Sequence, residues 1–360
     1  MSTVRTALIM AGGTGGHIFP GLAVAEALRE RGWRVHWLGG KGRPGQPSME
    51  SQLVPARGFA FEAIDFSGVR GKGLLTLAWL PLRLLQAFWQ SIQVLRRVRP
   101  DVVVGLGGYI TFPGGMMSVL LGKPLVLHEQ NSVAGLTNKL MAKIATRVLA
   151  AFPNALNKAI VIGNPVRADI AELAEPEKRF GMHKGALRVL VVGGSLGAQA
   201  LNDLIPQALV AMPAEARPHV IHQAGVKHIE ALQSNYAKHG AVAECRAFIE
   251  NMAEMYAWAD FVICRAGAMT VAELSAVGLG SLLVPFPFAV DDHQTTNAAY
   301  LADHKAAFLV QQKALTVEKL VNILTTLTRE NCLSMANKAR ALGKPTATVD
   351  VANICMEVAV

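Results

Sequence analysis

Short apolar runs of strand length alternate with longer amphipathic stretches along the whole chain. Alternation of this kind predicts parallel βαβ units and an α/β fold. In the first half the expected strands lie at residues 6–11, 34–38, 59–64, 101–105, 124–128 and 147–150. In the second half they lie at residues 187–192, 218–222, 242–248, 261–264, 281–285 and 306–310.

Each half opens with the same pattern, a strand followed by paired glycines, a small hydroxyl residue and a helix. The two copies are Ala7–Ala11 before Gly12-Gly13-Thr14-Gly15-Gly16-His17, and Val189–Val192 before Gly193-Gly194-Ser195-Leu196-Gly197. Glycine allows positive φ there and turns backbone N–H groups toward one point at the positive end of a helix. Such an arrangement binds a diphosphate or a similar anion. The repeat predicts two α/β domains that face each other across a ligand cleft.

Three further segments suggest how the chain is organised. Val161–Arg167 contains a glycine and a proline and is typical of a connection, so we place the domain boundary near Asn164. The Gly- and Pro-rich stretch Lys41–Ser48 predicts a mobile surface loop. Thr348–Val360 has helical apolar spacing and no strand partner.

Composition narrows the class of protein. The chain has 360 residues, enough for two domains with separate cores, and only 17% of them are charged, which excludes disorder. The net charge of +9 suits an anionic partner, and nucleic acid, acidic lipid and a phosphorylated substrate all qualify. Four scattered cysteines without a CxxC or zinc spacing fit core positions in a reducing cytosol.

Two apolar segments could be a secretory signal or a membrane span. The apolar run before the first glycines is too short for a secretory signal. Val102–Gly122 carries no charge over 21 residues, but it contains six glycines and Pro113, which would leave polar backbone bare in lipid. A buried strand that runs into a second glycine loop explains this segment better, so the chain is expected to be soluble or peripheral.

The glycine loops do not match the common nucleotide motifs. The first loop continues Gly15-Gly16-His17-Ile18, so the last glycine of G-x-G-x-x-G is missing. The second strand ends in Gly39-Gly40-Lys41 without a carboxylate for a ribose, and no Walker A sequence occurs. A dinucleotide-dependent dehydrogenase and a P-loop ATPase are therefore poor interpretations, and no cofactor is expected.

Seven motifs in order resemble the MurG family, the N-acetylglucosaminyltransferases that convert lipid I to lipid II in peptidoglycan synthesis. The motifs span nearly the whole chain. They are Gly12–Gly21, Gly107-Gly108-Tyr109 with Pro113-Gly114-Gly115, His128-Glu129-Gln130-Asn131 with Ala134–Lys139, Gly163–Arg167, Gly193-Gly194-Ser195, Arg265–Glu273 and Asp292–Ala298.

The resemblance implies two Rossmann-like domains of the GT-B type. Residues 1–164 would bind the acceptor and the membrane, residues 165–344 would bind UDP-GlcNAc, and a helix in 345–360 would pack back on the first domain. The implied reaction is inverting transfer of GlcNAc to the 4-hydroxyl of MurNAc-pentapeptide on undecaprenyl pyrophosphate. No acidic D-x-D pair lies in a suitable loop, so no required metal is expected.

The implied partners follow from that reaction. They are UDP-GlcNAc, the undecaprenyl-pyrophosphoryl-MurNAc-pentapeptide and an anionic membrane surface, together with other cell-wall or division proteins, and not nucleic acid. The implied location is the cytoplasmic face of the bacterial cell membrane, with peripheral attachment.

Glu273 has two interpretations. Thr270-Val271-Ala272-Glu273 fits a T-x-x-E capping box, and the residues alone favour that structural role. The resemblance implies instead that the carboxylate accepts hydrogen bonds from both ribose hydroxyls, and it favours nucleotide binding. The N–H groups of Ala268, Met269 and Thr270 would then face phosphate, with Val271 and Ala272 completing the donor site.

The other implied donor residues also have ordinary structural alternatives. Arg167 is otherwise a solvated side chain, and Ser195 is otherwise a helix N-cap, whereas both suit a phosphate oxygen. Ile249 would read uracil through its backbone and is otherwise a core isoleucine. Gln294 would reach the GlcNAc hydroxyls, and Asn131 would contact the donor sugar.

Two residues compete for the role of general base. A histidine at a glycine-rich turn often only bonds the backbone, but imidazole suits proton abstraction near neutral pH, which favours His17. Glu129 is the alternative, as base or as a group that orients the acceptor. Thr14, Gly15 and Gly16 would line the point where the two diphosphates approach, with Tyr109 and Asn138 on the acceptor side.

The stretch Leu74–Arg99 is expected to contact the membrane. Apolar residues, two tryptophans among them, cover more than one helix face and are interleaved with arginines. A core helix needs one apolar stripe, so the excess favours an interfacial patch over a buried helix pair.

Two rival functions share parts of these motifs. A UDP-GlcNAc epimerase would have the same fold and donor site without lipid contact. A non-catalytic membrane-docking protein would need the patch but not the donor residues.

Overall fold

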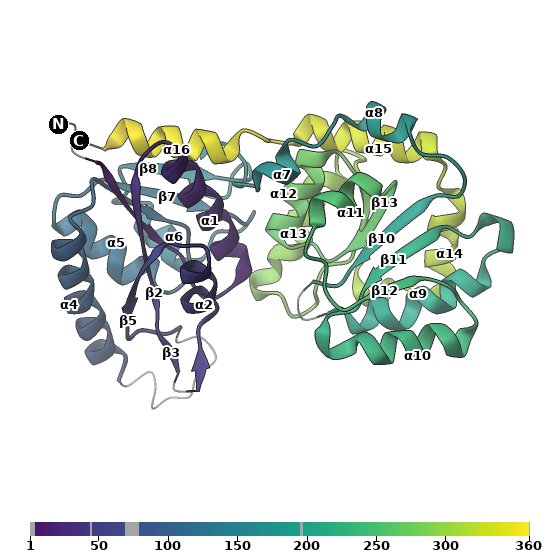
Figure 1. Ribbon diagram of the computed structural model, residues 1–360, viewed down its shortest axis with the longest axis horizontal. Helices are drawn as coiled ribbons and strands as arrows, with labels where there is room; N and C mark the ends of the chain where they lie inside the picture. The colour runs from purple at the N-terminus through teal and green to yellow at the C-terminus, as the bar shows by residue number, and fades with distance from the viewer. Residues whose placement is uncertain (1–3, 44, 69–78, 195–196, 360) are drawn as a thin grey trace. The chain divides into compact units, whose positions relative to one another are not determined.

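The computed structural model describes residues 4–43, 45–68, 79–194 and 197–359. The chain forms two compact units, residues 1–167 with 345–360 (unit 1) and residues 168–344 (unit 2), each built on its own parallel sheet. Figure 1 shows the elements of both units in chain order. Each unit is described by itself.

The sheet of unit 1 has seven parallel strands in the order β5-β2-β1-β6-β7-β8-β9. Their bounds are β1 Thr6–Met10, β2 Arg34–Gly40, β5 Ala60–Ile64, β6 Val102–Gly105, β7 Leu125–Glu129, β8 Arg147–Ala150 and β9 Ile160–Val161. The six strands predicted in this half are confirmed, and the two-residue edge strand β9 was not predicted. β6 also confirms that the uncharged segment beginning at Val102 starts as a buried strand.

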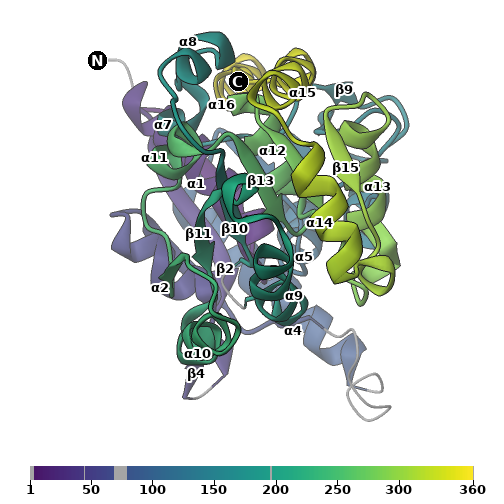
Figure 2. The same cartoon turned by 90° about the vertical axis from the view of Figure 1, so that its right-hand side faces the viewer.

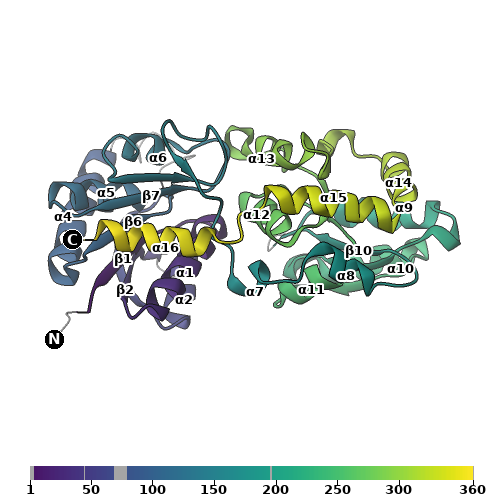
Figure 3. The ribbon, with the colours of Figure 1, turned by 90° about the horizontal axis from the view of Figure 1, so that it is seen from above.

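Alternation along β1 divides the core of unit 1 between two helical layers. Ala7 and Ile9 point to one face and pack with α1 and α16, whereas Leu8 and Met10 point to the other and pack with α4, α5 and α6. The helices are α1 Gly15–Glu30, α2 Met49–Ala56, α4 Leu80–Val98, α5 Thr111–Leu120, α6 Leu136–Met141 and α16 Ala347–Val358. Figure 3 shows α16 lying over this sheet next to α1.

The stretch Lys41–Ser48, which was predicted to be a mobile surface loop, contains a short hairpin. β3 (Gly42–Arg43) and β4 (Gln46–Pro47) pair antiparallel as a short hairpin. Gly42 has φ +84°, and a Cβ there would collide with the backbone of residues 46 to 48. Glycine at position 42 therefore allows the two strands to approach each other closely. At the base of the hairpin, Ser48 Oγ donates a 2.7 Å hydrogen bond to the carbonyl of Gly40.

The sheet of unit 2 has six parallel strands in the order β12-β11-β10-β13-β14-β15. All six strands predicted in this half form: β10 Arg188–Val192, β11 His219–Gln223, β12 Glu244–Arg246, β13 Phe261–Cys264, β14 Gly280–Leu283 and β15 Ala307–Leu309. β12 is shorter than the predicted 242–248, because only its three middle residues pair with β11.

Helices cover both sides of this sheet, with α9, α10 and α14 on one side and α8, α12 and α15 on the other (Figure 2). The α-helices are α7 Ala168–Ala171, α8 Pro176–Gly181, α9 Gln199–Ala211, α10 Ile229–His239, α11 Met252–Trp258, α12 Ala268–Val277, α13 His293–Ala302, α14 Val317–Thr326 and α15 Arg329–Leu342. In the described part of the chain, 3₁₀ turns lie at Ala214–Ala216, Val226–His228 and Gln312–Ala314, and Asp291 and Asp292 have positive φ in the turn Val290–Asp292.

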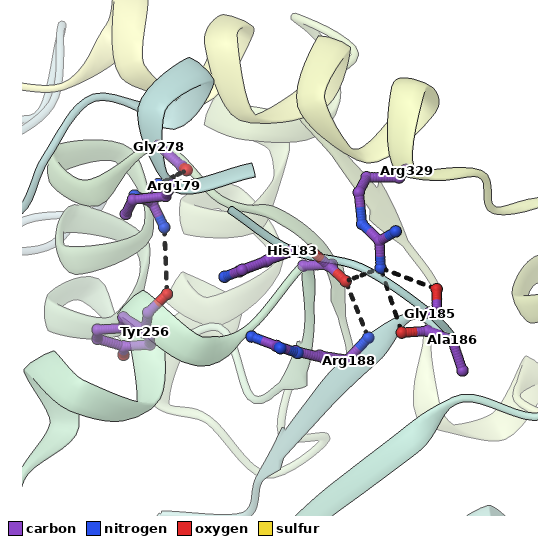
Figure 4. Close-up of polar contacts among 9 residues, drawn as sticks. Arg179, His183, Gly185, Ala186, Arg188, Tyr256, Gly278 and Arg329 are labelled. Carbon is purple, nitrogen blue, oxygen red and sulfur yellow. Dashed lines mark hydrogen bonds and ion pairs between the residues drawn. The ribbon is translucent and has the colours of Figure 1, made fainter. Parts of the chain in front are cut away.

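A buried carboxylate of unit 2, that of Asp260, accepts hydrogen bonds from His183, Arg188 and Arg329, which are labelled in Figure 4. Asp260 immediately precedes β13 and has no exposed surface, and the bonds from His183 Nδ1, the backbone N–H of Arg188 and Arg329 measure 2.6, 3.0 and 3.1 Å. Burial alone would raise the pKa of Asp260, but these donors outweigh burial and hold the pKa below its usual range. The carboxylate therefore stays ionised and ties α15 to the start of β10.

Arg179 of α8 is buried in the same region, and its side chain caps the C-terminal end of α12 (Figure 4). Its guanidinium donates to the carbonyls of Tyr256 (3.1 Å) and Val277 (2.8 Å), and also to that of Gly278 (2.6 Å), so a cation lies at the negative end of α12. Burial lowers the pKa of Arg179 to about 10, and nearby Arg340 acts in the same direction. Arg179 therefore remains charged near neutral pH.

Among the described residues, no helix combines the length and the apolar character needed to cross a bilayer.

Candidate functional site

The first glycine loop leads from β1 into the first turn of α1. Gly13 has φ +94°, a conformation that L side chains rarely adopt, and Thr14 is the N-cap residue of α1. The Thr14 side chain makes no capping hydrogen bond, and the first turn contains no acidic residue. Thr14, Gly15 and Gly16 thus lie at the positive end of the helix, where the sequence predicted an anion site.

A buried carboxylate that the sequence analysis missed lies against this loop. Glu50 of α2 has no exposed surface, and its oxygens accept hydrogen bonds from Tyr109 Oη (2.8 Å) and from the N–H groups of Gly13 and Gly40 (both 3.3 Å). A Cβ on Gly12 would lie 2.7 Å from Glu50 Oε1. Glycine at position 12 therefore leaves room for the carboxylate, a signal that the sequence carries only once the fold is known.

Glu50 also positions Tyr109, which was predicted on the acceptor side. Burial raises the pKa of Tyr109 well above its usual value, and the charge and hydrogen bond of Glu50 raise it further. The phenol therefore keeps its proton, and its O–H group donates a hydrogen bond to Glu50.

His17 lies in the first turn of α1 and is half-buried. Its Nδ1 is 3.0 Å from Oε1 of Gln130, which follows β7. Gln130 Nε2 donates to Nδ1 of His128 (3.1 Å), and His128 Nε2 donates to the carbonyl of Gly163 (2.8 Å). The predicted base is thus the outer member of a chain of polar groups that ends on buried backbone.

Glu129, the alternative base, is fully engaged within unit 1. Its carboxylate is 2% exposed and accepts hydrogen bonds from the N–H groups of Asn131 (2.9 Å) and Gly135 (3.2 Å), and from Asn138 Nδ2 (2.8 Å). Asn138 is 3% exposed and also donates to the carbonyl of His128 (3.3 Å). Both side chains organise the loop that carries Asn131, and this geometry favours positioning over direct contact with an acceptor.

The second glycine loop leads from β10 toward α9. Gly194 and Gly197 have φ of +80° and +77°. Ser195, a predicted donor contact, lies outside the described residues. The N-cap residue of α9 is Ala198.

The structure excludes the capping-box interpretation of Glu273. α12 begins at Ala268 with Gly267 as its N-cap, so Thr270 is already the third helical residue and cannot be the cap. Glu273 lies in the second turn, where its Oε2 accepts a 2.9 Å hydrogen bond from Tyr256 Oη. Ala268, Met269 and Thr270 form the first turn, whereas Val271 is buried in the core and Ala272 lies beside Glu273 on the helix.

Gln294 is held at the start of α13 by the loop after β14. Its Oε1 accepts the N–H of Phe286 at 2.9 Å, which leaves the amide N–H₂ as the donor end of the side chain. Arg265, a residue given no role above, fixes that loop through the carbonyls of Val284 (3.2 Å) and Pro285 (3.3 Å). The structure therefore adds Arg265 as the support for Gln294.

Two further predicted donor contacts are Ile249 in unit 2 and Arg167 in unit 1. The Ile249 side chain is 4% exposed, which matches a core isoleucine and leaves only its backbone for recognition. Arg167 is half-buried and ends the first segment of unit 1. Among the described residues, no group of three or more His, Cys, Asp or Glu side chains is arranged to hold a metal ion.

Both halves of the chain match models of one enzyme family. Residues 7–150 match the glycosyltransferase family 28 N-terminal domain, and residues 188–351 match the family 28 C-terminal domain. Together the two matches cover most of the chain and include both glycine loops.

Full-length relatives carry one name. The chain is 62% identical to the UDP-N-acetylglucosamine–N-acetylmuramyl-(pentapeptide) pyrophosphoryl-undecaprenol N-acetylglucosamine transferase of Polaromonas naphthalenivorans, over 100% of both chains. It is also 62% identical to the transferase of that name from Polaromonas sp. (strain JS666), over 99% of this chain and 92% of the relative.

Solved structures agree with this placement. The crystal structure of Acinetobacter baumannii MurG matches with a TM-score of 0.85 and 38% identity, over 98% of this chain and 99% of that one. The kitacinnamycin glycosyltransferase, 15% identical with a TM-score of 0.70, shares the GT-B fold alone. The chain belongs to glycosyltransferase family 28 and, within it, to the MurG family of N-acetylglucosamine transferases.

Proposed function

We propose that this protein transfers GlcNAc from UDP-GlcNAc to the 4-hydroxyl of MurNAc in undecaprenyl-pyrophosphoryl-MurNAc-pentapeptide, which makes lipid II for peptidoglycan synthesis. The observation that carries the proposal is the end-to-end identity of 62% with a transferase named for this reaction. The chain keeps a candidate residue for each chemical task, which supports the same reaction.

Unit 2 binds the donor in this proposal. The N–H groups of Ala268, Met269 and Thr270 at the start of α12 face the diphosphate, where the helix dipole favours negative charge. Because these groups are preorganised, they also stabilise the charge that develops on departing UDP. The remaining contacts are made by Ser195 and Arg167 to UDP, by the Ile249 backbone to uracil, and by Gln294 and Asn131 to GlcNAc.

Unit 1 binds the acceptor and supplies the base. Thr14, Gly15 and Gly16 lie where an anionic diphosphate is favoured, with Tyr109 beside them. His17 removes the proton of the attacking hydroxyl, and the attack inverts the anomeric carbon as UDP leaves. His17 suits this role better than Glu129, because the oxygens of Glu129 already accept hydrogen bonds from Asn131, Gly135 and Asn138.

A transfer assay tests the proposal directly. Radiolabelled UDP-GlcNAc is mixed with the lipid-linked muramyl pentapeptide, and the lipid fraction is analysed for label. Label in the lipid product supports the transfer. Label epimerised at the sugar without any acceptor supports the epimerase instead, and tight membrane binding without turnover supports a docking protein.

The role proposed for Glu273 predicts a donor-specific defect. We expect Glu273→Ala to raise KM for UDP-GlcNAc by about 10- to 100-fold, because hydrogen bonds to a charged acceptor contribute roughly 1.5–3 kcal/mol. KM for the lipid acceptor should change little. Steady-state kinetics with each substrate varied in turn measures both constants.

The matched control for this prediction is Tyr256→Phe. This change removes the hydroxyl that donates to Glu273 but leaves the carboxylate in place. If Tyr256→Phe raises KM for UDP-GlcNAc as much as Glu273→Ala does, the carboxylate acts through Tyr256 and not on the ribose.

We also propose that unit 1 attaches peripherally to the cytoplasmic face of the membrane through α4, α5 and α6, which are successive neighbours on one side of its sheet. The outer side of α4 exposes Trp79, Leu82, Leu85 and Trp89, all at 58% or more. The residues predicted for this patch between 69 and 78, namely Arg70, Lys72, Leu74, Leu75 and Leu77, lie outside the described residues.

The patch continues onto elements that the sequence analysis did not include. Leu120 of α5 and Leu136 of α6 are 70% and 73% exposed, and Leu140 and Ile144 are also exposed. Exposed cations lie among them: Arg83, Lys139 and Lys143. Apolar side chains interleaved with cations suit acyl burial combined with anionic headgroups.

A double substitution tests the membrane patch. We expect Leu85→Ser with Trp89→Ser to weaken binding to phosphatidylglycerol vesicles by about 10-fold or more, since each buried apolar side chain contributes roughly 1.5–3 kcal/mol. Co-sedimentation measures the binding. Val242→Ser, at an 87% exposed position of unit 2, serves as the control and should bind as the wild type does. Equal binding by the double variant would remove α4 from the membrane contact.

A further inference from the structure

Gln130, a side chain that is 1% exposed and has no role in the proposed reaction, connects His17 to buried backbone. We propose that Gln130 is a positioning residue that holds His17 in the tautomer with its proton on Nδ1, so that Nε2 carries the free lone pair. This inference deepens the proposed function and rests on His17 acting as the base there.

The anchor of this arrangement is His128. The ring has no exposed surface, and burial lowers its pKa to about 4, so it is neutral at physiological pH. Its Nε2 lies 2.8 Å from the carbonyl oxygen of Gly163, which can only accept. The proton of His128 is therefore on Nε2, and Nδ1 is an acceptor.

The anchor determines which way the Gln130 amide points. Gln130 Nε2 lies 3.1 Å from His128 Nδ1 and 3.2 Å from the carbonyl of His128, so both of its hydrogens have acceptors. A flipped amide would place its oxygen against two acceptors. Gln130 Oε1 therefore faces His17, and Asn164 holds the backbone below it through a 3.0 Å hydrogen bond to the Gln130 carbonyl.

The amide oxygen in turn selects the tautomer of His17. Oε1 accepts only, so His17 Nδ1 at 3.0 Å must carry the proton. Nε2 is then unprotonated and can accept a proton from a hydroxyl. Unlike the aspartate that orients the histidine of a serine protease, Gln130 adds no charge, so it sets the tautomer without favouring the imidazolium ion.

Nitrogen-15 NMR of the full chain tests the tautomer without any turnover. Long-range spectra of histidine-labelled protein at neutral pH distinguish the two neutral forms, and the His17→Gln spectrum assigns His17. We expect His17 to carry its proton on Nδ1. His128 and His222 provide the opposite pattern as internal references, because Nε2 of His222 donates to Asn202 Oδ1 at 3.1 Å. A proton on Nε2 of His17 in the wild type would overturn the inference.

Kinetics of two variants test the consequence for catalysis. Gln130→Leu removes the acceptor and should lower kcat by about 10- to 100-fold, a part of what general-base catalysis contributes. KM for UDP-GlcNAc should stay near the wild-type value. Gln130→Glu keeps an oxygen that can accept from His17 but loses both donors to His128, so its kcat should lie between those of Gln130→Leu and the wild type.

The outcomes separate this inference from the proposed function. A His17 spectrum unchanged in Gln130→Leu, or a kcat unchanged in that variant, contradicts the role of Gln130 even if the enzyme makes lipid II. Conversely, the expected spectra without any transfer to the lipid acceptor would support the tautomer and refute the reaction. Gln207→Leu, on the surface of α9 in unit 2, is the matched control and should change neither readout.

Discussion

The His17→Ala enzyme is expected to turn over about 10²- to 10⁴-fold more slowly than the wild type, because that is the usual contribution of a positioned general base. The loss should fall on kcat, since His17 belongs to unit 1 and the proposed donor contacts are mostly in unit 2. Single-turnover measurement of GlcNAc transfer at saturating substrates checks the result. The residual rate should also lose its acid limb.

Two control variants distinguish the loss of a general base from the loss of another histidine or of a positioning carboxylate. His36→Gln changes a histidine of β2 whose Nδ1 meets Glu62 at 3.1 Å, and it should leave kcat unchanged. Glu129→Gln disturbs the loop around Asn131 and should impair the reaction without removing its dependence on an ionisable base. Near-normal turnover of His17→Ala across neutral pH would exclude His17 from the role.

The Asp260→Ala protein is expected to lose about 3–5 kcal/mol of its free energy of unfolding, as is typical when one partner of a buried ionic network is removed. The loss arises because Arg329 and His183 keep their places but no longer face a carboxylate. Urea denaturation followed by tryptophan fluorescence measures the change, which should lie in the transition of unit 2.

The same network predicts a dependence on pH. The pKa of Asp260 is lower in the folded chain than in the unfolded one, so its contribution is complete above the unfolded value of about 3.9. It disappears as the pH falls through the folded pKa. The wild type and Asp260→Ala should therefore converge in stability at low pH, whereas the exposed control Asp303→Ala should follow the wild type throughout. An Asp260→Ala protein as stable as the wild type at neutral pH would show that the network contributes nothing.

Local sequence was sufficient for the strands because their signal is local. Val102–Val104 and Val189–Val191 are buried on both faces of their sheets and appear in the sequence as continuous apolar runs, which are typical of strands in parallel sheets. The hairpin of β3 and β4 was missed, because a ladder of two residues per strand leaves no periodic pattern to detect.

Only part of the candidate site could be predicted from local sequence. The glycine loops and the helix starts after them are marked by residue type, since positive φ at Gly13 and Gly194 demands glycine. In contrast, Thr270 and Glu273 have the spacing of a capping box, and only the observed start of α12 at Ala268 shows that they are not one. Local spacing alone favoured the wrong interpretation there.

The sequence by itself determined the alternation of strands and helices, the two glycine-rich turns and the family, because each depends on residues close together in the chain. Tertiary structure alone decided that Glu50 lies under Gly13 and that the carbonyl of Gly163, through His128 and Gln130, sets the proton on His17. The physical reason is that hydrogen bonds act over about 3 Å in space, whatever the separation along the chain. Partners 37 to 113 residues apart, such as Glu50 with Gly13 and Gln130 with His17, become neighbours only when parallel strands bring their ends to one edge of the sheet.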